Sequence, residues 1–472
     1  MVFTTYEFIF LFLPASYAGY RILNVLKHTE LSKLWLIAAS LWFFSRGSAW
    51  FLPWFTASIL INYLICRALL RRNSKLLLVI GLIENIGLLG YYKYANFLIY
   101  STDRFFNMEI PALDIVLPLG ISFFTFMMLS FLIDCYKGGV KEFALTDYLL
   151  YVTFFPKLIS GPIVRYGDFA PQLHSEKTFD FNFENIQKGF FIFAIGCAKK
   201  ALVANPLLGY TQGVFTDVTA AAPLEIFTGL FTNLFAFYFD FSGYVDMAIG
   251  LAFFFNMKLP ENFDSPYRAR NIQQYWKKWH ITLGLFLNRY VFGYMYKPGR
   301  GLAAFCTATM ATFFISGLWH GAGFNYIFWG LLHGAAVCIV AVIAVYYPKK
   351  YLMPQKAAQF LTFIFLLISA SLYACPNISA FFIMLKRLFN AVCWAEFYGS
   401  GGSHSMQMFF YDNIAVLLVL LLAAYITFFR KTTKEYAKCC MDNKKYALFA
   451  GLLFAASLFN MRTASTFLYF AF

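Results

Sequence analysis

Charged residues are scarce in this sequence. Only 13% of its 472 residues are Asp, Glu, Lys or Arg, whereas about a quarter of the residues in an ordinary soluble domain are charged. Hydrophobic residues make up 60% of the chain. Apolar runs of about 20 residues, which let a helix cross the ~30 Å hydrocarbon layer, recur from the first line of the sequence to the last. We therefore expect a single all-α, polytopic membrane domain over residues 1–472, without a soluble domain.

Cys-x-x-Cys pairs are missing as well. The nine cysteines are scattered, mostly within apolar runs, and the sequence contains no Cys-x-x-Cys pair. This pattern predicts neither a disulfide framework nor a zinc site, and we expect no metal. The N-terminal segment also lacks a basic leader and a small-residue cleavage site, so we expect it to be retained as the first helix.

The few charges are biased toward Lys and Arg, which leaves a formal net charge of +15. These basic residues lie in short gaps between apolar runs, which is typical of cytoplasmic loops rather than of nucleic-acid binding. Run length predicts early spans at about 5–25, 34–50, 54–70, 76–97 and 115–135. Basic gaps alternate with neutral or acidic ones, and the basic loop 430–445 precedes a predicted last span at 446–461. This alternation places the N-terminus and the tail 463–472 outside the cytoplasm.

The middle of the chain has no comparable regularity. Residues 147–174, 184–213 and 261–300 mix apolar side chains with Pro, Gly and paired charges. Irregular backbone at membrane depth is tolerated only where protein buries it or a watery cavity solvates it. We therefore predict no straight spans in these segments, and we expect the cavity and the function there.

Three of the six histidines lie close together in this part of the sequence, in YWKKWHITL, SGLWHGAGFNY and FWGLLHG. Imidazole exchanges protons near neutral pH, and a polar ring at membrane depth is a functional candidate. His320 is bracketed by glycines that leave room for a substrate, so we predict a catalytic role for it. For His280, beside two lysines and two tryptophans, a catalytic role and an interfacial anchor stand as alternatives. His333, in an otherwise apolar run, is predicted to be structural.

Two further segments place charge in apolar surroundings. The stretch 237–255 carries Asp240 and Asp246, and an isolated buried carboxylate costs several kcal/mol. We expect both to pair with Arg or Lys of the SPYRARN segment, 265–271, rather than to be catalytic. Arg165, in FFPKLISGPIVRYGDF, is either a loop anchor or a contact for a cofactor phosphate.

Five blocks together resemble the membrane-bound O-acyltransferase family, in its bacterial branch of alginate O-acetyltransferase and teichoic-acid D-alanyl transferase membrane proteins. The blocks are LPLGISFFTFMMLSFLID (117–134), FFPKLISGPIVRY (154–166), DFSGYVDMAIG (240–250), ENFDSPYRARNIQQYWKKWHITL (261–283) and SGLWHGAGFNYIFWGLLHG (316–334). They stand in the family's order and define a motif-bearing core at about 115–335.

The resemblance implies a fold of roughly 11 transmembrane helices, with re-entrant or horizontal helices, around a central tunnel. It implies an acyl thioester donor, such as acetyl-coenzyme A, with His320 as the catalytic histidine and His280 as the family's second histidine. The terminal FLYFAF matches a family hexapeptide, which implies that Tyr469 is a covalent acyl relay; the alternative for Tyr469 is an interfacial aromatic anchor.

The resemblance also implies a place and partners for the protein. We expect it in the bacterial cytoplasmic membrane, surrounded by lipid, where it passes an acyl group, most simply acetyl, to a separate extracytoplasmic transferase. A cell-surface or secreted polysaccharide would be the final acceptor. The chain has Asn288, Arg289 and Tyr290 where the acetyltransferase branch reads Arg-Asp-Tyr. This difference weakens the inference that this protein shares alginate as its substrate.

Three alternatives remain beside O-acetyl transfer. Within the family, D-alanyl transfer to teichoic acid is one, although the chain length and the FLYFAF terminus favour the acetyltransferase branch. A transporter of a small amphiphile would share the helix count and the charged middle. A haem protein could use His280, His320 or His333 as axial ligands.

Overall fold

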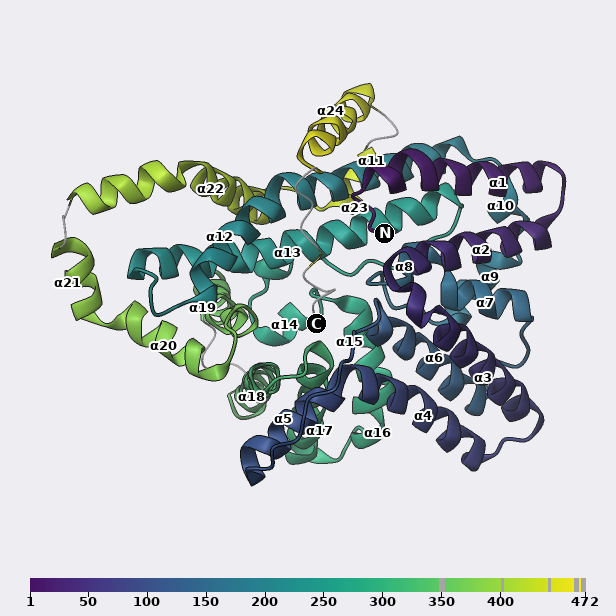
Figure 1. The fold of residues 1–472 in the computed structure, drawn as a ribbon, viewed down its shortest axis with the longest axis horizontal. Helices are drawn as coiled ribbons and strands as arrows, with labels where there is room; N and C mark the ends of the chain where they lie inside the picture. The colour runs from purple at the N-terminus through teal and green to yellow at the C-terminus, as the bar shows by residue number, and fades with distance from the viewer. Residues whose placement is uncertain (348–352, 400–402, 440–442, 462–466, 468–472) are drawn as a thin grey trace.

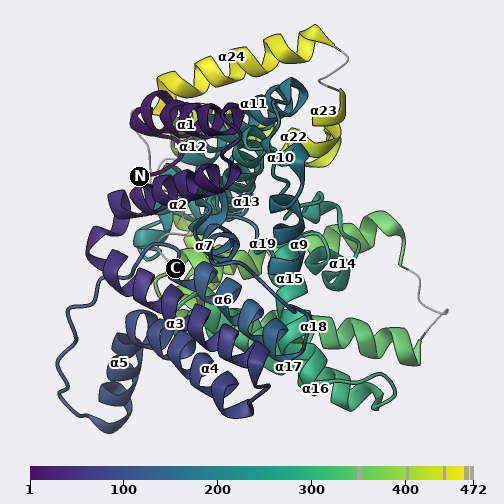
Figure 2. The same cartoon turned by 90° about the vertical axis from the view of Figure 1, so that its right-hand side faces the viewer.

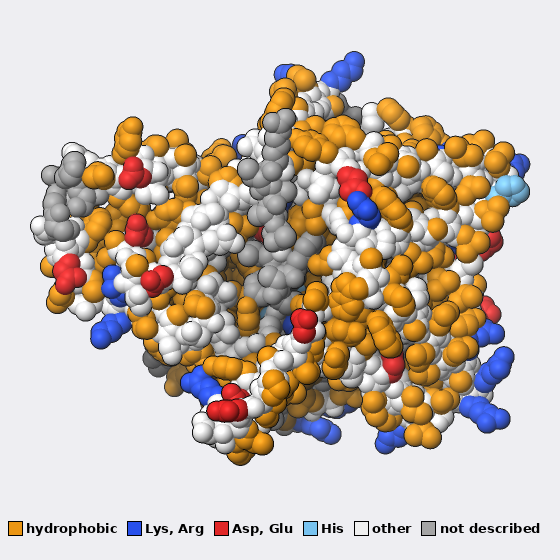
Figure 3. Space-filling view, viewed as in Figure 1, with side chains coloured by type: hydrophobic (Ala, Val, Ile, Leu, Met, Phe, Trp, Pro, Cys, Tyr) orange, Lys and Arg blue, Asp and Glu red, His pale blue; other side chains and the backbone are white. Residues whose placement is uncertain are grey.

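The computed structural model describes residues 1–347, 353–399, 403–439, 443–461 and Phe467. Helices follow one another along the chain (Figure 1), which confirms an all-α polytopic membrane protein. In this described part, nine helical runs are long and apolar enough to cross a membrane, or ten if Ile378–Phe389 and Ala391–Gly399, bent by 64°, form one span. Hydrophobic side chains cover most of the face in Figure 3, and most Lys and Arg on it stand at the edges.

The N-terminal third consists of helices that pack beside one another. They are α1 (Leu13–Val25), which follows the π-helical turn η1 (Phe8–Phe12), α2 (Thr29–Ser48), η2 (Ala49–Phe51), α3 (Leu52–Arg71), α4 (Lys75–Leu89), the π-helical turn η3 (Gly90–Tyr94), α5 (Ala95–Phe106) and α6 (Ile121–Tyr136). The first four predicted spans lie in helices long and apolar enough to cross a membrane, and the fifth corresponds to α6, a shorter apolar helix of 16 residues. The last begins later than predicted, because Gly120 turns the chain at φ +73° immediately before it.

Two of the three irregular segments contain no straight span, as predicted, and short helices fill them. The first contains α7 (Leu145–Thr153), α8 (Phe155–Leu158) and α9 (Tyr166–Leu173), and α10 (Glu176–Phe179) follows it. The other contains η5 (Pro266–Arg268), α14 (Ile272–Trp276), α15 (Ile281–Leu287), η6 (Asn288–Phe292) and α16 (Gly293–Met295).

The prediction for 184–213 is wrong. That segment lies in one continuous helical run, Phe183–Thr216, made of α11 (Phe183–Ala198), η4 (Lys199–Ala204) and α12 (Asn205–Thr216). Its paired lysines do not interrupt the helix, because Lys199 and Lys200 bond carboxylates of the neighbouring helix.

The core of the molecule is α13 (Pro223–Phe254), which is buried along almost its whole length. It runs antiparallel to α11, and two pairs of glycines bring the backbones together. A Cβ added at Gly250 would lie 2.6 Å from the carbonyl oxygen of Gly189, and one at Gly243 would lie 2.9 Å from that of Gly196. Small residues allow this close approach of helices in membranes, where packing and hydrogen bonds replace the hydrophobic effect.

In the C-terminal half, helices α19 to α22 pack against α13, and α17 and α18 pack against each other (Figure 1, Figure 2). The helices of this half are α17 (Gly301–His320), α18 (Phe324–Tyr346), α19 (Gln355–Ala374), α20 (Ile378–Phe389), α21 (Ala391–Gly399), α22 (Ser403–Phe429), α23 (Thr433–Cys439) and α24 (Lys444–Asn460). The last of these packs on α11 and coincides with the run predicted at 446–461. Of the tail 463–472, only Phe467 is among the described residues.

The glycine contact between α11 and α13 generates a stability prediction. Gly250→Ala should lower the free energy of unfolding by about 1 to 3 kcal/mol, since the added methyl group meets backbone atoms that cannot yield without separating the helices. Thermal unfolding of the detergent-solubilised protein measures the change. Gly213→Ala is the matched control, because a Cβ there meets nothing within 4 Å. A melting temperature for Gly250→Ala at or above that of the unmutated protein would contradict this packing.

Candidate active site

His320 is the last residue of α17 and only 2% exposed. The chain turns back after it into α18, and the two helices cross closely, because a Cβ at Gly330 would lie 3.0 Å from Cα of Gly317. This hairpin brings His333 of α18 near His320. Both rings contact Trp329, with ring centroids 5.1 Å from His320 and 4.6 Å from His333.

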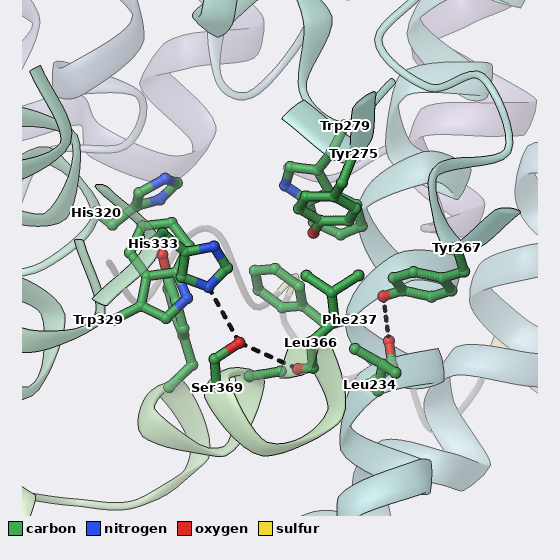
Figure 4. A pocket seen from close by; sticks show the side chains of 12 residues that line it. Leu234, Phe237, Tyr267, Tyr275, Trp279, His320, Trp329, His333, Leu366 and Ser369 are labelled. Atoms are coloured by element: carbon green, nitrogen blue, oxygen red, sulfur yellow. Dashed lines mark hydrogen bonds between the residues drawn. The ribbon is translucent and has the colours of Figure 1, made fainter. Parts of the chain in front are cut away.

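The two histidines line a small pocket of about 20 Å³. Figure 4 shows them on one side of it, with Tyr275 and Trp279 on the other. His333 Nε2 lies 3.0 Å from the hydroxyl of Ser369 on α19. This bond ties α18 to α19, in agreement with the structural role predicted for His333. A space of this size holds about one water-sized group.

His280 has a strained backbone. Its φ of 45° and ψ of 53° lie in the left-handed region, which L-residues rarely occupy. Neighbouring hydrogen bonds hold it there: Ile281 N donates to Asn262 O at 3.1 Å, and Asn262 Oδ1 accepts from Thr282 N at 2.9 Å and from Thr282 Oγ1 at 2.7 Å. Strain that the surroundings impose in this way clusters at functional sites, which favours a functional His280 over a simple anchor.

A larger cavity, of about 580 Å³, lies against His280. Apolar and aromatic residues of α15, η6 and α17 form much of its wall, together with the polar residues Thr309, Thr312 and Ser316 of α17 and with Gln273 and Lys277. Pockets of roughly 300 to 1,000 Å³ with an apolar lining and a few polar groups are typical of small-molecule sites. This cavity is therefore large enough for a substrate, whereas the pocket at His320 is not.

Trp319 joins the two predicted catalytic histidines. Its ring centroid is 4.9 Å from that of His320 and 6.0 Å from that of His280, and the ring stacks on Phe126 at 5.3 Å. His280 also contacts Phe241 of α13, at 4.7 Å. The fold thus brings both histidines to one aromatic wall, although they come from different segments of the chain.

Two side chains of η3 that we did not predict also reach this site. Lys93 Nζ donates to the backbone oxygen of Trp319 and lies 3.2 Å from Ser122 Oγ. The hydroxyl of Tyr94 donates to the backbone oxygen of Leu318 at 2.7 Å. The sequence did contain a signal, because a lysine inside an apolar run is a functional candidate.

Asp240 and Asp246 of α13 pair with η4, so the predicted partners in 265–271 are wrong. Asp240 lies 2.5 Å from Lys200 Nζ and Asp246 lies 2.6 Å from Lys199 Nζ. Arg268, from the predicted partner segment, instead donates to the backbone oxygen of Thr427. The lysines neutralise both carboxylates across the helix contact, which gives these aspartates a structural role.

Arg165 stands at the start of α9, with Nη2 2.9 Å from Asp134 Oδ2. Arg289 Nη2 approaches the other oxygen of Asp134 at 3.6 Å. The side chains of Arg165 and Arg289 remain 34% and 49% exposed, whereas that of Asp134 is 4% exposed. Arg165 is thus anchored, and the two arginines around one carboxylate keep an excess of positive charge that could bind a phosphate group.

Among the residues that the structure describes, no group of three or more His, Cys, Asp or Glu could hold a metal ion.

Tyr469 lies outside the described residues. Phe467, two positions before it, is 1% exposed; its ring centroid is 4.8 Å from that of Tyr244 and 4.4 Å from Lys200 Nζ. Tyr244 follows Phe241 by about one turn of α13, or ~5 Å along the axis. Phe467 is therefore buried against α13, about one turn from Phe241, the residue that contacts His280.

Comparison with known proteins identifies the family of the chain. The family model described as "MBOAT, membrane-bound O-acyltransferase family" matches residues 136–383. A peptidoglycan O-acetyltransferase of Helicobacter pylori is 36% identical over 421 residues, 82% of this chain and 80% of that protein. A probable alginate O-acetylase of Pseudomonas aeruginosa is 32% identical over 407 residues, 84% of this chain and 76% of that one. A teichoic acid D-alanyltransferase of Bacillus subtilis is 29% identical over 231 residues, 47% of this chain and 58% of its own length. The chain belongs to the membrane-bound O-acyltransferase family and is an acyltransferase.

Proposed function

We propose that this acyltransferase takes an acetyl group from a cytoplasmic thioester donor and passes it across the bacterial cytoplasmic membrane, toward hydroxyls of a cell-surface polysaccharide. The observation that carries the proposal is the meeting of His280 and His320 around Trp319, beside a cavity of ligand size. Acetyl is favoured over D-alanyl because the relatives named for O-acetyl transfer align with 82% and 84% of the chain, and the D-alanyltransferase with 47%.

The donor is a thioester such as acetyl-coenzyme A. The narrow arm of coenzyme A that carries the acyl group contains both apolar carbons and amides, which suits the larger cavity at His280, where Thr309, Thr312 and Ser316 of α17 would bond the amides. The exposed guanidinium groups of Arg165 and Arg289 support a site for its phosphates, because two arginines share the single carboxylate of Asp134.

His320 serves as general base in the transfer. A hydroxyl oxygen attacks the thioester carbonyl, a new C–O bond forms and the C–S bond breaks. The hydroxyl proton passes to the imidazole of His320 and then to the sulfur, which leaves as a thiol. His280, on the wall of the larger cavity, is placed to hold the donor carbonyl or the developing oxyanion.

The hydroxyl that attacks the thioester carbonyl is the phenol of Tyr469. Phenol has a pKa near 10 and a thiol about 8.5, so a tyrosyl ester keeps much of the transfer potential of a thioester. The burial of Phe467 supports this role, because two further residues extend the chain by up to about 7 Å. An acceptor hydroxyl outside then attacks the tyrosyl ester, and the phenol regains its proton.

The last transfer belongs to a separate extracytoplasmic transferase. The relatives act on polymers that lie outside the cytoplasmic membrane, to judge from the peptidoglycan, alginate and teichoic acid in their names. In this proposal a partner protein carries the acyl group from the tail to such a polymer. The polysaccharide is therefore an indirect acceptor of this protein.

The role of His320 predicts that His320→Ala lowers acyl transfer by about 100-fold or more, since a lost general base typically costs that much. The measurement is the O-acetyl content of the surface glycan in a strain with only this substitution, at matched membrane expression. His28→Ala, at an exposed position between α1 and α2, is the control. Undiminished acylation in His320→Ala cells would rule out this role.

The relay predicts a covalent adduct. Tyr469→Phe keeps an aromatic anchor but removes the attacking oxygen, so it should abolish both glycan acylation and an acyl adduct on the C-terminal peptide, detected by mass spectrometry. Tyr411→Phe, at a tyrosine of α22 that is 84% exposed, should leave both unchanged. Normal acylation in Tyr469→Phe cells would refute the acyl relay, and Tyr469 would then be an interfacial anchor.

The direction of transfer requires both termini outside and the loops 67–75 and 430–445 inside, as their basic charge predicts. A cysteine added after Phe472 should react with a membrane-impermeant maleimide in intact cells. Arg72→Cys, between α3 and α4, should react only after the cells are permeabilised. The opposite labelling pattern would refute the topology and the mechanism built on it.

A further inference from the structure

The carboxyl end of α17 lies inside the protein, at His320. The last four carbonyl groups of a helix have no partner within the helix and need donors from elsewhere. Two of these carbonyls, at Leu318 and Trp319, receive donors from η3 at the junction of α4 and α5. Tyr94 bonds the first at 2.7 Å, and Lys93 bonds the second.

Lys93 is an unusual residue for this position. It stands in an apolar run, and none of the ion pairs formed by the described residues includes it. Its ammonium group faces the carbonyl of Trp319, the hydroxyl of Ser122 and the ring of Trp319, whose centroid is 5.7 Å away. A cation there meets the negative end of the α17 dipole, which offsets part of the cost of placing charge at membrane depth.

The backbone of η3 is unusual where it meets α17. The segment Gly90–Tyr94 is a π-helical turn, and such turns are frequent at functional sites. Lys93 and Tyr94 are the last two residues of this turn, and they bond successive carbonyls at the end of α17.

A third element joins the same contact. The indole nitrogen of Trp319 donates to the backbone oxygen of Ser122 at 3.4 Å, in the first turn of α6. Trp319 is therefore held at its carbonyl by Lys93 and at its ring by Ser122. Since its ring lies between His280 and His320, any displacement of the end of α17 would move both histidines relative to each other.

From these contacts we infer that Lys93 is a positioning residue for His320, assisted by Tyr94: together they cap α17 and hold Trp319 and His320 in the reacting geometry. The inference depends on the proposed catalytic role of His320. Lys93 does not touch the acyl group in this account. Its effect comes from alignment, to which transfer reactions are sensitive at the scale of 1 Å.

The test uses the full chain in lipid nanodiscs, with acetyl-coenzyme A as the probe and thiol release as the activity. Lys93→Met removes the donor and the charge at similar length, Lys93→Gln keeps a donor, and Tyr94→Phe removes one hydroxyl. Tyr91→Phe, on the same turn but exposed, is the matched control. Hydrogen exchange of the peptide 316–324 reports the order of the α17 end independently of activity.

We expect Lys93→Met to lower kcat by about 10- to 100-fold with KM changed less than about twofold, because a misaligned base slows the chemical step more than it weakens binding. Exchange in 316–324 should become faster. Lys93→Gln should recover part of both losses, Tyr94→Phe should show a smaller loss, and Tyr91→Phe should match the unmutated protein.

Unchanged exchange and unchanged kcat in Lys93→Met would overturn the positioning role, and so would a loss of binding alone, seen as a raised KM. If Lys93→Met does not fold, kcat and the hydrogen exchange of 316–324 are measured on Tyr94→Phe instead. The inference is wrong if neither of them changes in that variant. A full rate in His320→Ala would refute the proposed function instead, while the exchange of 316–324 would still test the cap.

Discussion

The interior of a bilayer offers no hydrogen-bond partner, so each polar group at that depth has to be satisfied within the protein. The arrangement of this molecule follows from that constraint. Lys200 meets Asp240 across the contact of η4 with α13, and Asn262 meets Thr282 inside the irregular segment 261–300. His280 lies in that irregular segment, next to Asn262 and Thr282.

Close packing then makes this polar centre rigid. The glycines of α11 and α13, and those of α17 and α18, bring helices to backbone contact, and aromatic rings fill the space around His280 and His320. A catalytic base and a donor site raise the reaction rate most when their geometry is set before the substrate binds, since no free energy is then spent on aligning them during the reaction. The strained backbone of His280 fits such a site, because its neighbours hold it in place.

The two cavities differ in size in a way that matters for a reaction across a membrane. The larger one, at His280, has room for a donor arm, while the smaller one, at His320, admits little more than water. In the proposed reaction only the acyl group crosses, carried by a segment of the protein whose Phe467 is seated on Tyr244 and Lys200. Neither the donor nor the polysaccharide then needs to pass through the bilayer.

Run length and composition alone predicted the early apolar helices, because a membrane helix satisfies its backbone bonds locally. They also marked His320 and the irregular segment that holds His280, since polar groups are costly at membrane depth. The continuous helix Phe183–Thr216 was not predictable in this way, because its lysines are neutralised by carboxylates of α13. Lys93 likewise stood out only as an odd charge in an apolar run. Its partner, the Trp319 carbonyl, comes from a distant helix, and contacts between distant segments are set by how helices pack rather than by local sequence.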